Sequence, residues 1–408
     1  MSAIPSRTSK IEQLNKKQVH AMALENLKQH LELKGSGEKS TPDKVLDVLL
    51  AAATNKSSIE QECSSLEGAP SPNTVRGVLR ESLKLENLER QVNQALWAHL
   101  NTRYWKRSQK VAVDLVEVPY HGLAAKDSDE IRRGQAKQGT TYFHVFATAY
   151  VVRQHRRVTL ALHYVRQDES LVSVLDALKS WLDELGIQVG LWLADRAFCS
   201  VAALRWFSQQ PEAIVPMVAR GKKAPLSGSR VLFSSTQSYW DRYTMHSQTD
   251  GTFTFDVAVV RRYSKPSRRG KQVPPTTLVY AVVGKRLQPK RTKRSFYSVV
   301  ETYRSRFGIE SSYRQMNQAR LRTCSRSPEL RLLAVALAKR LRRSFAFVLR
   351  NLWALCRWMT LSHSRPGRPS GESNFRFHTL LRWISRMVEN RLALLTTIEL
   401  PTPSPTRF

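Results

Sequence analysis

The feature that most constrains the fold is a regular succession of strand-like and helix-like segments between residues 108 and 221. Five apolar segments rich in β-branched and aromatic residues predict strands, at residues 110–122, 142–152, 157–165, 187–195 and 213–219. Leucine and valine at helical spacing predict a helix at 168–186, and a second helix is expected at about 198–208. The order β-β-β-α-β-α-β indicates an α/β fold built on a mixed sheet.

The segment before this region predicts helices. Two short helices are expected at about 59–66 and 73–84, with Ser71 or Asn73 as the cap of the second. The inner face of that second helix would carry Val75, Val78, Leu79 and Leu83, and its outer face Asn73, Thr74, Arg76 and Arg80. The spacing fits a helix-turn-helix, whose second helix enters the major groove of DNA, and it equally fits an ordinary helical hairpin.

The pattern changes again after residue 221. Strand-like segments at 230–236, 252–263 and 276–284 predict a β-rich insertion. Helical periodicity returns at about 296 and continues past 320, and further helices are expected at about 328–360 and 375–396. The expected division is a helical DNA-binding domain at 1–105, the first part of an α/β core at 106–221, the insertion at 222–294, a helix completing the core at 295–325 and a C-terminal helical region at 326–408.

Charge narrows the class of partner. The 408 residues include 65 Lys and Arg against 33 Asp and Glu, a formal net charge of +32 that is spread along the whole chain. So large an excess indicates a polyanionic partner, because each phosphate contact releases condensed counterions. DNA, RNA and an anionic membrane surface all meet this requirement, and the even spread favours a long track of nucleic acid.

Cysteine usage and hydropathy indicate the compartment. The four cysteines lie far apart, at Cys63, Cys199, Cys324 and Cys356, which argues against a zinc finger and suits a reducing environment. The first residues lack the apolar run of a signal peptide, and basic residues interrupt the most apolar stretch, 330–359, too often for a membrane span. We therefore expect a cytoplasmic, nucleoid-associated protein with no membrane contact.

Two aspartates occupy positions that a simple sheet would not need. Asp114 lies in the middle of the first predicted strand, where a buried carboxylate is costly unless it is paired or bound to metal. Asp195 ends the fourth strand, at the edge where open α/β sheets bind ligands, although a strand-end cap is an alternative role for it. If these strands are neighbours, the carboxylates converge. Cutting a phosphodiester with two divalent ions needs about three such oxygen donors.

Asp114, Asp195 and the Arg-Ala-Phe that follows resemble the ribonuclease-H-like catalytic domain of insertion-sequence DDE transposases, over residues 108–325. One branch of that family inserts a β-rich domain before the helix that carries the third acid, and marks the helix with Tyr, Arg, Glu and Lys at fixed spacing. Tyr303, Arg306 and Glu310 stand at these spacings, and Asn317 stands where the family has Lys. At about 100° per residue the four positions share one helix face. Arg314 lies on that face and could supply the missing cation.

The resemblance implies a fold, a reaction and partners. The fold is a ribonuclease-H-like α/β core of order β-β-β-α-β-α-β-α. Asp114, Asp195 and Glu310 would be the catalytic residues and would hold two Mg²⁺ ions, with Mn²⁺ as a substitute. The residues expected to contact DNA are Tyr303, Arg306, Arg314, Asn317, Trp240, Arg76 and Arg80. The partners would be double-stranded DNA, as terminal inverted repeats and as target, and a second copy of the chain in a homodimeric DNA complex.

Several alternatives accompany this interpretation. Trp240 would stack on a base flipped out near the cut, or would be a core or turn aromatic. Glu117 and Asp256 are competing acids, but strand alternation places Glu117 on the face opposite Asp114, and Asp256 falls in the insertion. The rival functions are a non-transposing metal-dependent nuclease on the same fold, and an inactive DNA-binding relic or repressor.

Overall fold

The computed structural model describes residues 14–35, 37–100, 107–123, 128–137, 139–153, 156–263, 274–285, 295–316, 319, 321, 323, 325–337, 347–362 and 375–396. Contacts divide the chain into two compact units, one formed by residues 1–98 and 313–408 and the other by residues 99–312. Within the described ranges, no helix has both the length and the apolar character needed to cross a bilayer.

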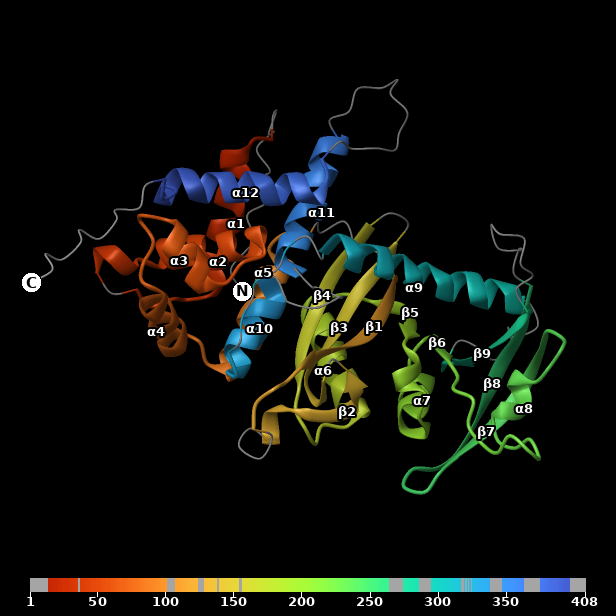
Figure 1. Cartoon of the computed structure of the whole chain (residues 1–408). Helices are drawn as coiled ribbons and strands as arrows, with labels where there is room; N and C mark the ends of the chain where they lie inside the picture. The colour runs from red at the N-terminus through yellow and green to blue at the C-terminus, as the bar shows by residue number, and fades with distance from the viewer. Residues whose placement is uncertain are drawn as a thin grey trace, which may run out of the picture. The chain divides into compact units, whose positions relative to one another are not determined.

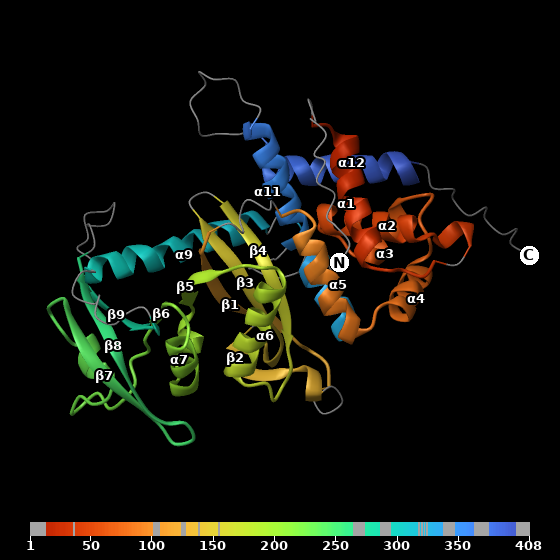
Figure 2. The same cartoon turned by 180° about the vertical axis from the view of Figure 1, so that it is seen from behind.

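The first unit is helical. Its elements are α1 (Lys16–His30), η1 (Glu38–Ser40), α2 (Pro42–Asn55), α3 (Ile59–Ser65), α4 (Pro72–Ser82), α5 (Leu85–Trp97), α10 (Pro328–Leu337), α11 (Phe347–Ser362) and α12 (Phe377–Leu392). α12 packs against α1 and α2, and α10 and α11 pack against α5 (Figures 1 and 2). The structure thus groups the N-terminal helices with the helices after residue 326 in one unit, whereas the sequence pattern divides them into two regions, 1–105 and 326–408. An amphipathic helix buries its apolar stripe against any complementary neighbour, and periodicity does not reveal which.

The helical hairpin expected at 59–84 is present as α3 and α4. Ser71 caps α4, its Oγ accepting a hydrogen bond from the Thr74 backbone N–H at 3.2 Å. All members of the predicted inner face are buried: Val75, Val78, Leu79 and Leu83. The connecting turn is also tied to the end of α12, because the Gly68 N–H donates to the Leu392 carbonyl at 2.7 Å.

The second unit is built on one mixed sheet. Its described strands are β1 (Gln109–Pro119), β2 (Arg132–Lys137), β3 (Thr140–Arg153), β4 (Arg156–Val165), β5 (Val189–Ala194), β6 (Ala213–Pro216), β7 (Tyr239–Ser247), β8 (Gly251–Arg262) and β9 (Thr276–Val283). The order is β2-β3-β1-β5-β6-β9-β8-β7, and β4 also pairs with β3. β5 runs parallel to both β1 and β6, whereas the other pairings are antiparallel. The predicted mixed α/β fold is confirmed at this level.

Three local predictions in this unit differ from the structure. Residues 230–236, expected as a strand, contain the short helix α8 (Arg230–Phe233), since so short an apolar run fits either state. β2 and β7 were not expected. The segment expected as an insertion, 222–294, contributes β7, β8 and β9 to the same sheet, because β9 pairs antiparallel with β6. The remaining elements are η3 (Ser128–Glu130), α6 (Leu171–Glu184), η4 (Arg196–Phe198), α7 (Val201–Ser208) and α9 (Phe296–Met316).

The sheet presents two faces with different contents. Odd-numbered side chains of β1 and β3, such as Val113 and Ala147, share a buried cluster with apolar residues of α6 and α7. Even-numbered side chains, including Asp114, point to the opposite face. α9 packs on that opposite face, where the Tyr303 ring meets the Tyr280 ring of β9 at a centroid distance of 5.1 Å. It passes close to β5 in both views of the molecule (Figures 1 and 2).

Candidate active site

Parallel pairing of β1 with β5 brings the two candidate aspartates to the same level of the sheet. Val113 of β1 is the register partner of Ala194 of β5. Asp114 and Asp195 are the next residues of their strands, so both follow directly from a paired position. This neighbourhood of the two strands is what the sequence pattern predicted. The side chain of Asp114 is 16% exposed and that of Asp195 is 37% exposed.

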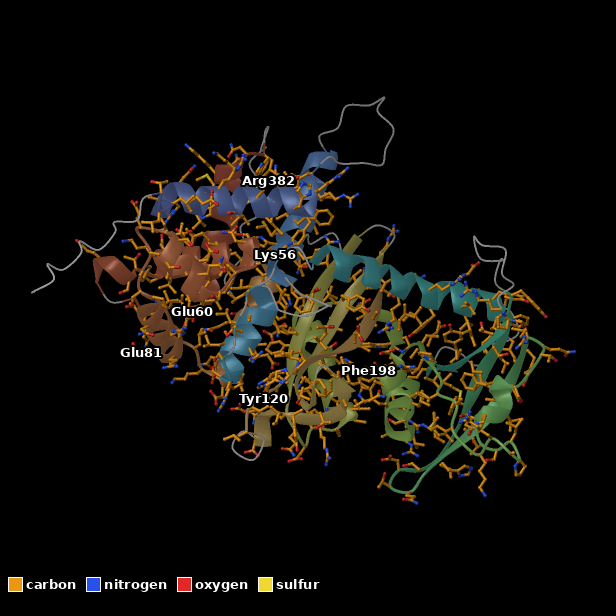
Figure 3. All side chains as sticks on the ribbon, in the orientation of Figure 1. Lys56, Glu60, Glu81, Tyr120, Phe198 and Arg382 are labelled. Carbon is orange, nitrogen blue, oxygen red and sulfur yellow. The ribbon has the colours of Figure 1, made fainter. Side chains whose placement is uncertain are left out.

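Asp195 also has the capping role that the sequence left open. Its Oδ1 accepts a hydrogen bond from the Arg196 N–H at 2.7 Å and so begins η4. Phe198, which is labelled in Figure 3, is the last residue of η4 and has no exposed surface. The cap holds the carboxylate in place at the end of β5. The two roles are compatible, because one oxygen serves the cap while the side chain stays partly open to solvent.

A buried guanidinium joins the two aspartates. The Nη2 of Arg306 lies 3.1 Å from Asp114 Oδ1, and its Nη1 lies 3.7 Å from Asp195 Oδ1. Burial acts to lower the pKa of Arg306, but nearby Tyr150 and the carboxylates act to raise it, and the net shift is upward. Arg306 therefore stays charged and is the counter-ion of both acids. The sequence resemblance implies that Arg306 binds a DNA phosphate, which is another anion.

Tyr303 fixes the helix that carries Arg306. Its side chain is only 3% exposed, and its hydroxyl donates to the Ala194 carbonyl at 3.1 Å while accepting from Arg306 Nη1 at 3.2 Å. Burial raises the pKa of Tyr303, so the hydroxyl remains a donor. Tyr303 anchors α9 to the last residue of β5, immediately before Asp195. Its contact with DNA stays a prediction.

Replacing Tyr303 with Phe tests this anchoring role. We expect Tyr303→Phe to lower the free energy of unfolding by about 1 to 2 kcal/mol, because the buried Ala194 carbonyl loses its donor. Urea denaturation of the full chain, followed by hydrogen exchange of α9 peptides, measures the loss. Tyr297→Phe is the matched control, since Tyr297 lies on the same helix and is 54% exposed. An equal effect of both substitutions would contradict the assignment.

The third predicted acid lies in the expected helix. Glu310 and Arg314 both belong to α9, and Glu310 follows Arg306 by about one helical turn, on the same face. The side chains of both lie outside the described residues, as does the whole of Asn317. Of the side chains that the structure describes, no three of His, Cys, Asp or Glu gather as a metal site.

The donor chemistry nevertheless fits a divalent cation. Asp114 and Asp195 offer only carboxylate oxygen, the ligand type that Mg²⁺ prefers. They converge closely enough to share one cation, which is the guanidinium of Arg306.

The competing acids have other partners. Glu117 pairs with Lys137 of β2 at 2.5 Å and lies on the α6 and α7 face of β1, opposite Asp114, as alternation predicted. Asp256 of β8 lies 3.9 Å from Arg242 of the adjacent strand. Neither is brought to Arg306 within the described contacts, so both remain ranked below the chosen aspartates.

Trp240 lies on β7, the last strand in the sheet order. It is register partner to Ala258, which pairs in turn with Tyr280 of β9. Trp240 therefore shares the sheet face of Asp114 and stands two strand spacings, about 10 Å, from Tyr280. Its stacking on a flipped base stays a prediction. Tyr280 does not stand out in the sequence, because alternation separates the two faces of β9 without showing which one α9 covers. The pairing of β9 with β6 places it on the face of Asp114.

The predicted DNA-contacting arginines of the hairpin have different surroundings. Arg80 is exposed at the end of α4. Arg76 forms an ion pair with Glu60 of α3, which is labelled in Figure 3, and a hydrogen bond with Asn73 at 3.1 Å. Of the two arginines, Arg80 is therefore the better candidate for a contact with a DNA phosphate.

No protein-family model matches the chain, and no curated protein matches it. Two observations therefore bear on function: the geometry of Asp114, Asp195 and Arg306, and the resemblance of the sequence motifs.

Proposed function

We propose that this protein is the transposase of an insertion sequence, which binds the ends of its element and catalyses metal-dependent DNA cleavage and strand transfer by a cut-and-paste route. The observation that carries the proposal is the convergence of Asp114 and Asp195 from neighbouring parallel strands on one buried cation of α9. A sheet gains no stability from two carboxylates placed side by side, so their pairing indicates a site that binds cations.

Each residue has a proposed role in this reaction. Asp114, Asp195 and Glu310 would hold two Mg²⁺ ions. When bound by these residues, the ions would supply charge to activate the attacking water or hydroxyl and to stabilise the leaving oxygen. The Asp195 carboxylate is oriented by the hydrogen bond with which it caps η4, and Tyr303 fixes the position of α9 along β5 through its hydrogen bond to Ala194. A ribonuclease-H-like core is the fold we propose for this sheet and its helices.

The DNA-binding surfaces follow from the same proposal. A net charge of +32 suits a protein that follows two DNA ends and a target. The α3 and α4 hairpin would bind the terminal repeat, with Arg80 as a phosphate or base contact. Two copies of the chain would pair two element ends in a homodimeric complex.

Cleavage of the element's own ends tests the function. The purified full chain is mixed with a labelled duplex that carries one end of the element, and with a plasmid as target, in Mg²⁺, Mn²⁺ or EDTA. We expect nicks at the end that free a 3′-hydroxyl, and joining of that strand to the plasmid, only when metal is present. A duplex with a scrambled end is the control and should remain intact.

Two other outcomes would replace the proposal. Metal-dependent cutting of both duplexes, without joining to the plasmid, would indicate a nuclease. Binding of the end without cleavage in either metal would indicate a relic or repressor.

A further inference from the structure

The site already contains a cation of its own. The Arg306 side chain is 11% exposed and reaches both aspartates from α9. Two carboxylates at the same level of neighbouring strands, one inside β1 and one just after β5, repel each other unless a positive charge lies between them. Arg306 meets this need without any ion from solution. Its positive charge balances the two carboxylates, as a bound divalent cation would.

The guanidinium is only partly satisfied where it lies. Its Nε is buried and has no hydrogen-bond acceptor among the described residues. Its Nη1 is divided between the Tyr303 hydroxyl at 3.2 Å and Asp195 at a longer 3.7 Å. A guanidinium has five N–H donors in a rigid fork that matches phosphate oxygens. A phosphate would use these donors more fully than the two aspartates do.

We propose that Arg306 is an exchangeable internal counter-ion. When Asp114 and Asp195 take up divalent metal, Arg306 gives up the carboxylates and turns its donors to a phosphate of the bound DNA. Without metal, the same guanidinium stays paired with both carboxylates. This inference rests on the proposed function and adds a coupling to it. Metal should strengthen DNA binding, and DNA should strengthen metal binding by the same factor, because each removes one half of the ion pair.

Metal affinity in the absence of DNA tests the exchange without any measurement of activity. The free Mn²⁺ signal in electron paramagnetic resonance is titrated with wild-type protein, with Arg306→Met and with Arg304→Met. Arg304 is the matched control, because it lies on the same helix, is exposed, and loses the same charge on substitution. We expect Arg306→Met to bind Mn²⁺ about tenfold more tightly than wild type, within the usual range of coupled sites. Arg304→Met should bind as wild type does.

Thermal unfolding gives an independent readout. In EDTA, Arg306→Met should melt at a lower temperature than wild type, because its carboxylates have lost their counter-ion. Added Mg²⁺ should raise the melting temperature of the variant more than that of wild type. If Arg306→Met does not fold, Arg306→Lys is used in its place. The Arg306→Lys variant keeps the positive charge but loses the forked N–H donors of the guanidinium. It should bind Mn²⁺ more tightly than wild type, but by a smaller factor than Arg306→Met does.

The outcomes separate this inference from the proposed function. Equal Mn²⁺ affinity in wild type and the Arg306 variant overturns the exchange and leaves the metal site standing. Equal tightening by Arg304→Met and Arg306→Met also overturns it, because the effect is then one of net charge. Absence of Mn²⁺ binding in every protein overturns the proposed metal-dependent function and the exchange together.

Discussion

The Asp114→Asn and Glu310→Gln variants are each expected to cleave the element's ends on the order of 1,000-fold more slowly than wild type, with DNA binding retained. An amide keeps the shape of the carboxylate but loses the charge that holds a hard cation, and such a loss at a transition-state contact typically costs about two to three orders of magnitude or more. Cleavage is measured on the labelled end duplex in Mg²⁺, and binding is measured on the same duplex in EDTA by fluorescence anisotropy.

Each variant has a control from its own element. Glu117→Gln lies three residues beyond Asp114 on β1, on the opposite face and paired with Lys137. Glu301→Gln lies on α9 with Glu310 and is exposed. Both controls remove one carboxylate from the same strand or helix and should cleave at the wild-type rate. Loss of cleavage in Glu117→Gln with full activity in Asp114→Asn would show that the wrong face of β1 was chosen.

The arrangement of the two aspartates was predictable because it follows from local pattern. An aspartate inside a β-branched strand must face something polar, and another at the end of a later strand lies where α/β sheets bind ligands. The structure places those strands side by side and parallel. The inner face of α4 was predictable for a similar reason, since helical spacing alone decides which residues can be buried together.

Other features depend on tertiary contacts that local pattern does not contain. β2 has the sequence RRGQAK and is mostly exposed, and it is a strand because the beginning of β3 offers a pairing edge. The sequence pattern likewise did not show that Arg306 pairs with the two aspartates. A helix face that carries Arg predicts an anion, but whether that anion is a phosphate or a carboxylate is decided by how Tyr303 seats α9 on β5.

The helical unit contains a second charged cluster, and its disruption should have the largest effect on stability. Asp47 of α2 has no exposed surface, and its Oδ1 lies 2.8 Å from His20 Nε2 of α1. Its Oδ2 lies 2.8 Å from Arg391 Nε of α12, in an ion pair whose N–H does not point at the oxygen. One carboxylate therefore joins an N-terminal and a C-terminal helix to α2.

We expect Asp47→Asn to lower the free energy of unfolding of the helical unit by about 3 kcal/mol, because removing one partner of a buried ionic group leaves the others without compensation. Hydrogen exchange in increasing urea, read on α1, α2 and α12 peptides, measures the loss, and β1 and β3 peptides report the second unit, which should be unchanged. Asp43→Asn is the control: Asp43 also pairs with Arg391, at 3.8 Å, but its side chain is 33% exposed, so water already screens the contact. A loss in Asp47→Asn no greater than that in Asp43→Asn would contradict this assignment, because the buried carboxylate would then contribute no more than the exposed one to holding α1 and α12 against α2.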